Sequence, residues 1–357
     1  MGRELAAAIG RWSALEDHPA APTLRAVCDP SEPAREWFRR IPTVTTITDD
    51  RRRLLDDPEI DVLYLAVPHH LHEELYLDAI AAGKDFLGEK PFGIDLEAAR
   101  RIVEAIPPER FVRCSSEMPY FPGAQRAYQL IRSGALGRIF EAHAAFLHSS
   151  DLDLAKPINW KRQARYCGEL GVIADLGMHV VHVPLRLGWE PETVHATIQD
   201  IVTERPGPDG RPVPCDTPDN ATLHTTVGGF PLTLETKRIA PGHANTWSLK
   251  VLGIDGGVEF STATPKDLWT FERRDGHQLW QREQTGSVSA FPTITGPIFE
   301  FGFPDAILQM WAAYLAEREG ELGDRLGCVT PQEALQSHEL FAAALRSARS
   351  GAAERVA

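Results

Sequence analysis

The N-terminal third of the chain alternates short apolar or β-branched runs with helical patterns. Residues 62–67 (VLYLAV) form a continuous apolar run, which is typical of a strand buried on both faces of a parallel sheet. Residues 72–82 have helical spacing and are followed by Gly83, a residue type that often ends helices. Further strands are expected at 24–28, 43–48, 85–88 and 111–114, and helices at 31–40, 50–55 and 95–105. This alternation predicts a doubly wound, Rossmann-like parallel sheet.

Strand patterns dominate after Pro119. Glycine pairs at 228–229 and 256–257 separate apolar runs as β-hairpins require. Segment 205–219 is rich in Pro and Gly and is interpreted as a surface loop. The expected strands are 139–147, 193–203, 221–227, 232–238, 247–252, 257–261 and 268–272, and the expected helices are 123–133, 171–187, 304–319 and 331–350. We therefore predict a second, α+β domain with a large, mostly antiparallel sheet.

These patterns divide the chain into three parts. Residues 1–118 are expected to form a dinucleotide-binding domain, and residues 119–330 a domain for substrate and self-association. Residues 331–357 are expected to form a C-terminal helix that packs back on the N-terminal half. One face of the second sheet needs helices and the site to cover it. We expect the other face to be apolar and to join copies of the chain into a homodimer or homotetramer.

Charge and composition narrow the function classes. The formal net charge of −13 argues against nucleic acid or an anionic membrane as a partner. No apolar run approaches the roughly 18 residues of a membrane-spanning helix, and the N-terminus has no apolar signal core. The five cysteines are scattered and lack CxxC spacing. We expect reduced thiols in a cytoplasmic protein.

Polar residues directly after the predicted strands are the first functional candidates, because parallel sheets bind ligands at the carboxyl ends of their strands. Asp29 follows strand 24–28, where an acid could accept hydrogen bonds from the adenosine ribose and repel a 2′-phosphate. This favours NAD over NADP, although Asp29 could instead cap the next helix. Lys90 follows strand 85–88 and is expected in the ligand crevice. Alternatively, Glu89 and Lys90 are an exposed surface pair.

Three histidines, His69, His70 and His72, follow strand 62–67. No carboxylate or cysteine is spaced to complete a metal site with them, so we predict no bound metal. His72 could serve instead as a polar group at the start of the next helix.

The glycine fingerprint of a dinucleotide fold is incomplete. Such a fold opens with a strand and G-x-G-x-x-G, whereas here Gly2 is followed at once by a helical pattern over residues 3–15. This is what remains if a strand and two glycines are removed from the front. Alternatively, Met1 is the true start and Gly2 has no role. We expect the sheet to lack its first strand, which lies centrally in the order 3-2-1-4-5-6.

Several motifs follow one another along the chain. They are Ala66-Val67-Pro68-His69-His70-Leu71-His72, Ala82-Gly83-Lys84, Glu89-Lys90-Pro91, Gly134-Ala135-Leu136-Gly137-Arg138-Ile139, Asn159-Trp160-Lys161, Gly168 to Gly171 and Asp175-Leu176-Gly177-Met178-His179. In this order they resemble the glucose–fructose oxidoreductase, inositol dehydrogenase and rhizopine catabolism (Gfo/Idh/MocA) family. The resemblance runs over nearly the whole chain and departs from the family pattern at the glycine fingerprint, at His69 and at Glu117 to Tyr120.

The resemblance implies the site. Lys90, Asp175 and His179 would be the catalytic residues, with Lys90 polarising the substrate oxygen and Asp175 orienting His179 or binding substrate. It also suggests a cis Lys90–Pro91 peptide. The cofactor, NAD or alternatively NADP, would contact Gly2, Asp29, Pro68, His69, His72, Glu89, Lys90, Trp160 and Lys161.

Elementary chemistry permits these roles. Asp175 and His179 are four residues apart, so they share one face of a helix. His179 has an ordinary pKa near 6.5 and could therefore exchange a proton at neutral pH. Asp175 and His179 could instead be a surface pair, or a zinc half-site with His182, for which no strong further ligand is evident.

We predict an NAD(P)-dependent oxidoreductase that moves a hydride between nicotinamide and a secondary alcohol or ketone. The resemblance implies a small polyhydroxy substrate such as a sugar, sugar acid or inositol. One alternative is a redox-neutral enzyme, an epimerase or a glycoside-cleaving enzyme, that oxidises and re-reduces its substrate. Another is an inactive ligand-binding or sensor protein, which the incomplete first strand would suit.

Overall fold

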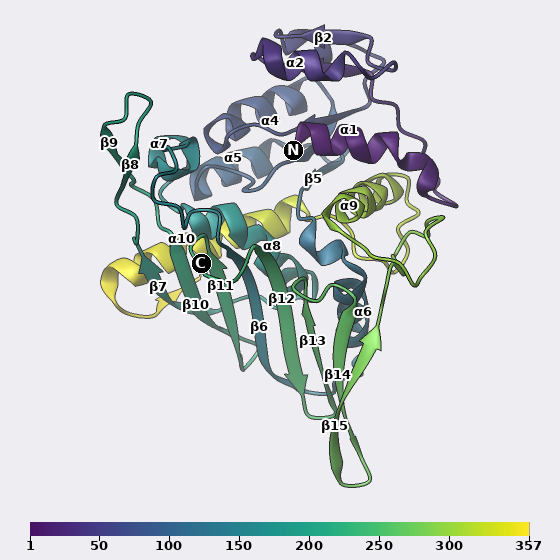
Figure 1. The fold of residues 1–357 in the computed structure, drawn as a ribbon, viewed down its shortest axis with the longest axis vertical. Coiled ribbons are helices and arrows are strands. Elements are labelled where there is room, and N and C mark those ends of the chain that lie inside the picture. The colour runs from purple at the N-terminus through teal and green to yellow at the C-terminus, as the bar shows by residue number, and fades with distance from the viewer. Residues whose placement is uncertain (357) are drawn as a thin grey trace.

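The computed structural model describes residues 1–356 and has two halves with different sheets (Figure 1). The first half alternates helices and parallel strands, as predicted. Its elements are α1 (Gly2–Gly10), β1 (Ala26–Cys28), α2 (Glu32–Phe38), β2 (Thr46–Thr48), α3 (Arg52–Leu55), β3 (Val62–Leu65), α4 (His72–Ala81), β4 (Asp85–Gly88), α5 (Leu96–Ala105) and β5 (Val112–Cys114).

The parallel strands of the first half form two separate sheets, β1–β2 and β3–β4–β5. In the strand order 3-2-1-4-5-6 these correspond to positions 3-2 and 4-5-6. Among residues 1–356 no strand stands at position 1, as expected. Helix α1 packs against α9 (Phe303–Arg318) of the second half (Figure 1).

The second half is built on one nine-stranded sheet with the order β15-β14-β13-β12-β6-β11-β10-β7-β16. All neighbouring strands are antiparallel except β6 and β11, which run parallel. Its strands are β6 (Ile139–His148), β7 (Thr193–Gln199), β10 (Asn220–Val227), β11 (Phe230–Lys237), β12 (Asn245–Gly253), β13 (Gly256–Ser261), β14 (Asp267–Arg274), β15 (His277–Gln284) and β16 (Glu354–Arg355). The predicted fold class is therefore confirmed.

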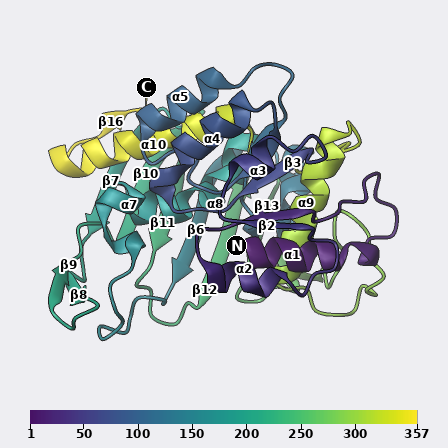
Figure 2. The same ribbon diagram turned by 90° about the horizontal axis from the view of Figure 1, so that it is seen from above.

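Helices cover one face of this sheet. Helix α8 (Val172–Arg186) packs on β6, β10 and β11, and is buried along most of its length. Helix α6 (Pro122–Arg132) packs on β13 and β14. Helix α10 (Pro331–Ser350) contacts α5 of the first half as well as α8 and β7 of the second (Figure 2). The C-terminal segment therefore joins both halves, because β16 also pairs with β7.

The outer face of the nine-stranded sheet corrects one expectation, since it is mainly polar rather than apolar. His143 and Lys250 point away from the buried face, where Ala142, Ala144, Leu249 and Val251 alternate with them. Trp269 of β14 and Trp280 of β15 are among its exposed apolar side chains. Buried and exposed residues thus alternate along the strands, as in antiparallel sheets that expose one face to solvent.

Two further expectations were wrong. Only Leu63 of β3 is buried, and Ala66 is exposed, because β3 pairs with β4 alone. Segment 205–219 is not a simple loop. It contributes to a small hairpin of β8 (Glu204–Pro206) and β9 (Pro212–Pro214), and Arg205 is buried beneath backbone carbonyls that it binds.

Candidate active site

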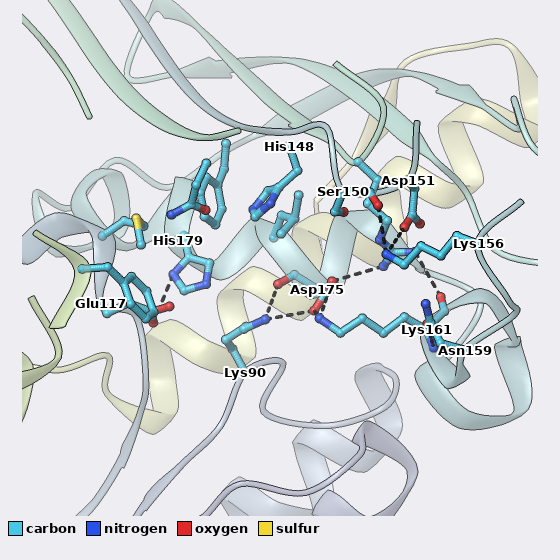
Figure 3. A pocket seen from close by; sticks show the side chains of 16 residues that line it. Lys90, Glu117, His148, Ser150, Asp151, Lys156, Asn159, Lys161, Asp175 and His179 are labelled. Carbon is cyan, nitrogen blue, oxygen red and sulfur yellow. Dashed lines mark hydrogen bonds and ion pairs between the residues drawn. The ribbon is translucent and has the colours of Figure 1, made fainter. Parts of the chain in front are cut away.

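A cavity of about 450 Å³ lies where the first half meets the nine-stranded sheet (Figure 3). Lys90 reaches it from the end of β4, and Asp175 and His179 reach it from α8. The structure therefore brings together the three residues predicted to be catalytic. The other polar residues that line the cavity are Glu117, His148, Ser150, Asp151, Lys156, Asn159, Lys161, Arg238 and Asn245.

Lys90 is held by the turn that follows β4. The Lys90–Pro91 peptide is cis, as the resemblance suggested. The buried ring of His72 bridges this turn to the end of β3, with Nδ1 2.6 Å from the Pro91 carbonyl oxygen and Nε2 2.9 Å from the Val67 carbonyl oxygen. His72 is fully buried, so it supports the position of Lys90 from behind.

Asp175 lies in the first turn of α8 and is surrounded by cations. Its carboxylate accepts hydrogen bonds from Lys90 Nζ at 2.9 Å, from Lys161 Nζ at 2.9 Å and from Arg238 Nη2 at 3.2 Å. Burial alone would raise the pKa of Asp175, but these three cations outweigh it and hold the pKa well below the ordinary value. Asp175 therefore stays ionised.

The helix carrying Asp175 can begin where it does because Gly171 precedes it. Gly171 has a φ of +51°, and a Cβ there would lie 2.7 Å from Cδ of Pro218. A side chain at this position would therefore shift either the helix start or the loop that packs on it.

His179 lies one turn after Asp175 on the same face of α8. Its Nδ1 is 3.4 Å from Ser116 Oγ and 3.8 Å from Glu117 Oε2, while its carbonyl oxygen accepts a hydrogen bond from Trp247 Nε1 at 2.7 Å. Burial, and then the charge of Lys90, lower the pKa of His179 well below 6.5. His179 is therefore neutral at pH 7, and the expectation that it titrates near neutrality does not hold in this environment.

Lys90 keeps its charge despite being largely buried. Burial opposes the charge, but Asp175, Glu89 and Glu117 together outweigh it and raise the pKa of the ammonium. Lys90 Nζ also donates to the backbone carbonyl of Asp175 at 2.7 Å. The site thus pairs a fixed cation with a neutral imidazole.

Three more predicted residues surround this centre. His69 is 3% exposed, and its Nε2 lies 3.8 Å from Asp175 Oδ1. The ring of Trp160 packs edge-on against His69, with 4.8 Å between centroids. Glu89 is buried and accepts a hydrogen bond from Tyr64 Oη. His69 and Glu89 are therefore buried side chains that pack around Asp175 and Lys90 rather than line the cavity.

The remaining predicted residues lie outside the cavity lining, in the first half. Asp29 follows β1, is partly exposed, and accepts a hydrogen bond from the Ser31 backbone at 2.7 Å. Pro68 is partly exposed after β3. Gly2 is the first residue of α1, and a Cβ there would meet Phe38 only at an ordinary 3.8 Å, so this position does not demand glycine.

The sequence predictions missed Glu117, His148 and Arg238. Arg238 directly follows β11, whose alternate residues are buried, so its inward direction could have been read from the strand pattern. Glu117 was noticed only as a departure from the family pattern. The contact between His179 and Glu117 joins residues 62 positions apart, and no local pattern predicts it.

Among residues 1–356, no three His, Cys, Asp or Glu side chains gather as they would to hold a metal ion. None of the helices in this part of the chain is long and apolar enough to cross a membrane.

Comparisons with known proteins cover both halves of the chain. Residues 6–112 match the oxidoreductase family with an NAD-binding Rossmann fold, and residues 124–259 match the GFO/IDH/MocA C-terminal domain. Levoglucosan dehydrogenase of Pseudarthrobacter phenanthrenivorans is 28% identical over 301 residues, which are 80% of this chain and 74% of that protein. Inositol 2-dehydrogenase of Pseudomonas fluorescens is 33% identical over 119 residues, 33% of this chain and 35% of that protein.

Solved structures share the fold over the full length. A levoglucosan dehydrogenase in complex with NADH superposes with a TM-score of 0.91 at 23% identity, covering 100% of this chain and 96% of that one. An inositol dehydrogenase homologue from Azotobacter vinelandii in complex with NAD+ gives a TM-score of 0.78 at 20% identity, covering 96% and 92%. With both of its domain models matched in order, the chain belongs to the Gfo/Idh/MocA family of NAD-binding oxidoreductases.

Proposed function

We propose that this chain is an NAD-dependent dehydrogenase that acts on a secondary alcohol of a small polyhydroxy substrate, such as a sugar, a sugar acid or an inositol. The observation that carries the proposal is the convergence of Lys90, Asp175 and His179 on one cavity, from both halves of the protein. The names of the relatives, levoglucosan dehydrogenase and inositol 2-dehydrogenase, support the substrate class.

The residues of the first half fit a dinucleotide. Asp29, Ala66 and Pro68 follow parallel strands at their carboxyl ends and are at least partly exposed. Asp29 offers a carboxylate to a ribose hydroxyl and would repel a 2′-phosphate, so we propose NAD rather than NADP. When bound, the nicotinamide supplies the hydride acceptor.

The charge states of the site suit alcohol oxidation. Lys90 stays cationic, so it can stabilise negative charge that develops on the substrate oxygen. Neutral His179 can accept the hydroxyl proton at Nε2, the nitrogen that does not face Glu117. Asp175 holds Lys90, Lys161 and Arg238 in place and compensates part of their charge.

The test is NADH formation. Purified protein is incubated with NAD+ and a panel that contains levoglucosan, myo-inositol, other sugars and sugar acids, and the absorbance at 340 nm is followed. We expect NADH to accumulate with at least one of these compounds. Conversion of a compound without NADH accumulation would indicate redox-neutral chemistry instead, and failure to bind NAD+ would contradict the proposal outright.

We also propose that copies of the chain associate in the cytoplasm as a homodimer or homotetramer through the outer face of the nine-stranded sheet. The exposed rings of Trp269 and Trp280 support this, since aromatic side chains are enriched at interfaces. Light scattering at micromolar concentration tests the assembly. A monomeric mass would contradict it, and a Trp280→Glu variant should weaken any oligomer.

A further inference from the structure

Glu117 stands out among the cavity residues because its carboxyl group has little to bind. Its side chain is almost completely buried, and Oε2 lies 3.8 Å from Nδ1 of His179 (Figure 3). Among the described residues, this oxygen has no hydrogen-bond partner. A buried carboxylate without a partner is costly, so the position needs an explanation.

The proton that leaves the substrate also needs a group that accepts it. Protonated His179 would be a buried cation close to Lys90, and both burial and that charge lower the pKa of His179. Lys90 already holds its own proton. His179 can therefore pass a proton on more readily than it can keep one.

The cavity offers three carboxyl groups that could receive this proton, and they differ in kind. Three cations hold Asp175 ionised. Burial would raise the pKa of Asp151, but Lys156 and other cations outweigh it and lower the pKa. For Glu117, burial prevails over Lys90 and raises the pKa. Glu117 is thus the carboxyl group in this cavity that most readily takes a proton, and it also faces His179.

We propose that Glu117 and His179 form a proton relay, an inference that rests on the dehydrogenase function proposed above. In oxidation, the hydroxyl proton of the substrate moves to Nε2 of His179, while the proton on Nδ1 moves to the carboxylate of Glu117. The imidazole stays neutral, the substrate hydride leaves to the nicotinamide, and the carbonyl forms. Afterwards Nε2 releases its proton to cavity water, and Glu117 returns its proton to Nδ1. Reduction runs through the same steps in reverse.

Several charged or titratable groups face this pair from the surrounding elements. Lys90 and Glu89 come from the end of β4, Asp175 from α8 and His148 from β6. Lys161 and the amino group of Met1 also act on the pair. The 3.8 Å separation can shorten when substrate binds, as catalytic hydrogen bonds often do.

The first test reads the protonation of Glu117 without turnover. Infrared difference spectra of the purified full-length protein are recorded between pH 8 and pH 4, for wild type, Glu117→Gln and Glu317→Gln. Glu317 is the matched control, because this half-buried glutamate also has one buried oxygen without a hydrogen-bond partner. It binds Arg113 and lies outside the cavity lining. We expect a carboxylic acid C=O band to appear at a pH above the range in which glutamates ordinarily take up a proton. This band should persist in Glu317→Gln and be lost in Glu117→Gln. A band that Glu117→Gln leaves unchanged would overturn the relay.

The second test uses turnover with whichever compound of the panel is oxidised. Glu117→Gln should lower kcat by roughly 10- to 100-fold, because His179 must then carry the proton itself. The acid limb of kcat/KM should move to lower pH, toward the depressed pKa of His179. Sodium formate should restore part of the rate to Glu117→Ala, which leaves room for it, but not to Glu117→Gln.

The outcomes separate this inference from the proposed function. An active enzyme whose Glu117→Gln variant keeps the wild-type rate and pH profile overturns the relay alone. A protein that shows the Glu117 band but oxidises nothing in the panel contradicts the dehydrogenase function. If formate does not raise the rate of a Glu117→Ala variant that unfolds at the same temperature as wild type, Glu117 has only a structural role, and the relay is overturned.

Discussion

β3 and β4 are neighbouring parallel strands in the same sheet, yet they are buried very differently. All four residues of β4 are buried, whereas β3 is buried only at Leu63. β4 has β3 on one side and β5 on the other. β3 has no strand on its other side within residues 1–356. The difference shows how far neighbouring strands determine the burial of a strand.

The residues that we propose to be catalytic follow the more deeply buried strand or lie on a buried helix. Lys90 directly follows β4, and Asp175 and His179 lie on the deeply buried α8. Asp29 and Pro68, in contrast, follow the partly exposed β1 and β3. The end of the site that we propose to be catalytic is thus the more deeply buried one, as the precise placement of reacting groups requires. The end that we propose to bind the adenosine is partly exposed, so we expect it to tolerate more change.

The largest effect is expected at His179. Replacing it with alanine removes the group that accepts the substrate proton, and kcat should fall by roughly 10²- to 10⁴-fold. Binding of NADH, followed by fluorescence titration, should be nearly unchanged because His179 is not among the residues expected to contact the cofactor. Weakened NADH binding with an unchanged kcat would contradict this role, because His179 would then bind the cofactor and not accept the proton.

Lys90→Ala should have a somewhat smaller effect. Loss of the cation removes stabilisation of the developing alkoxide, a contribution of about 3 kcal/mol or about a hundredfold in kcat. Lys90→Arg should not restore the rate, because a planar guanidinium does not reproduce the point charge bound to Asp175. Initial rates at saturating substrate give the answer, and full activity of Lys90→Arg would argue for a purely structural cation.

Acid should destabilise the buried part of the molecule. Burial lowers the pKa of His182 on α8 and of His338 on α10 to about 3. Both are neutral in the folded protein but protonate near pH 6.5 when unfolded, so stability is greatest above pH 6.5 and is lost as the pH falls toward 3. From pH 6.5 to pH 5 we expect the free energy of unfolding to drop by about 2 kcal/mol per histidine.

Urea denaturation at the two pH values measures this drop in the free energy of unfolding. The drop should be smaller in His338→Gln by about the contribution of one histidine. In the folded protein His338 Nε2 accepts a hydrogen bond from the Gly93 backbone, a role that a glutamine oxygen can take over. A free energy of unfolding that does not change between pH 6.5 and pH 5 would show that these two side chains are more accessible to solvent than the structure places them.

The smallest effect is expected at the open end. Asp29→Ala removes one hydrogen-bonding carboxylate from a partly exposed site, so NADH affinity should fall by about 3- to 10-fold. NADPH affinity should rise at the same time, because a repulsive charge is gone. Parallel fluorescence titrations give the ratio, and an unchanged preference would remove Asp29 from the cofactor site.

The sequence predicted the fold class because strand and helix periods are local. The capping of α5 shows this, since Asp95 accepts a hydrogen bond from the Ala98 backbone at 2.8 Å, at the position where the helix was expected to begin. Burial of residues 62–67 was predicted wrongly because it depends on a neighbouring strand. An apolar run does not reveal whether that neighbour is present.

The site was predicted only in part for a related reason. Lys90, Asp175 and His179 lie in recognisable motifs, and their convergence follows from the fold. The charge states do not follow from the motifs. The neutral state of His179 depends on burial and on Lys90, and the three cations around Asp175 come from three separate segments.

The central claim is that Lys90 and His179 act together in one NAD-dependent active site. The most direct test is the initial rate of NADH formation by the Lys90→Ala/His179→Ala double variant, compared with wild type and with both single variants at matched NAD+ binding. Because residues that act on one transition state are not additive, we predict that the double variant loses little more than His179→Ala alone. A double variant that forms NADH at close to the wild-type rate would contradict the account.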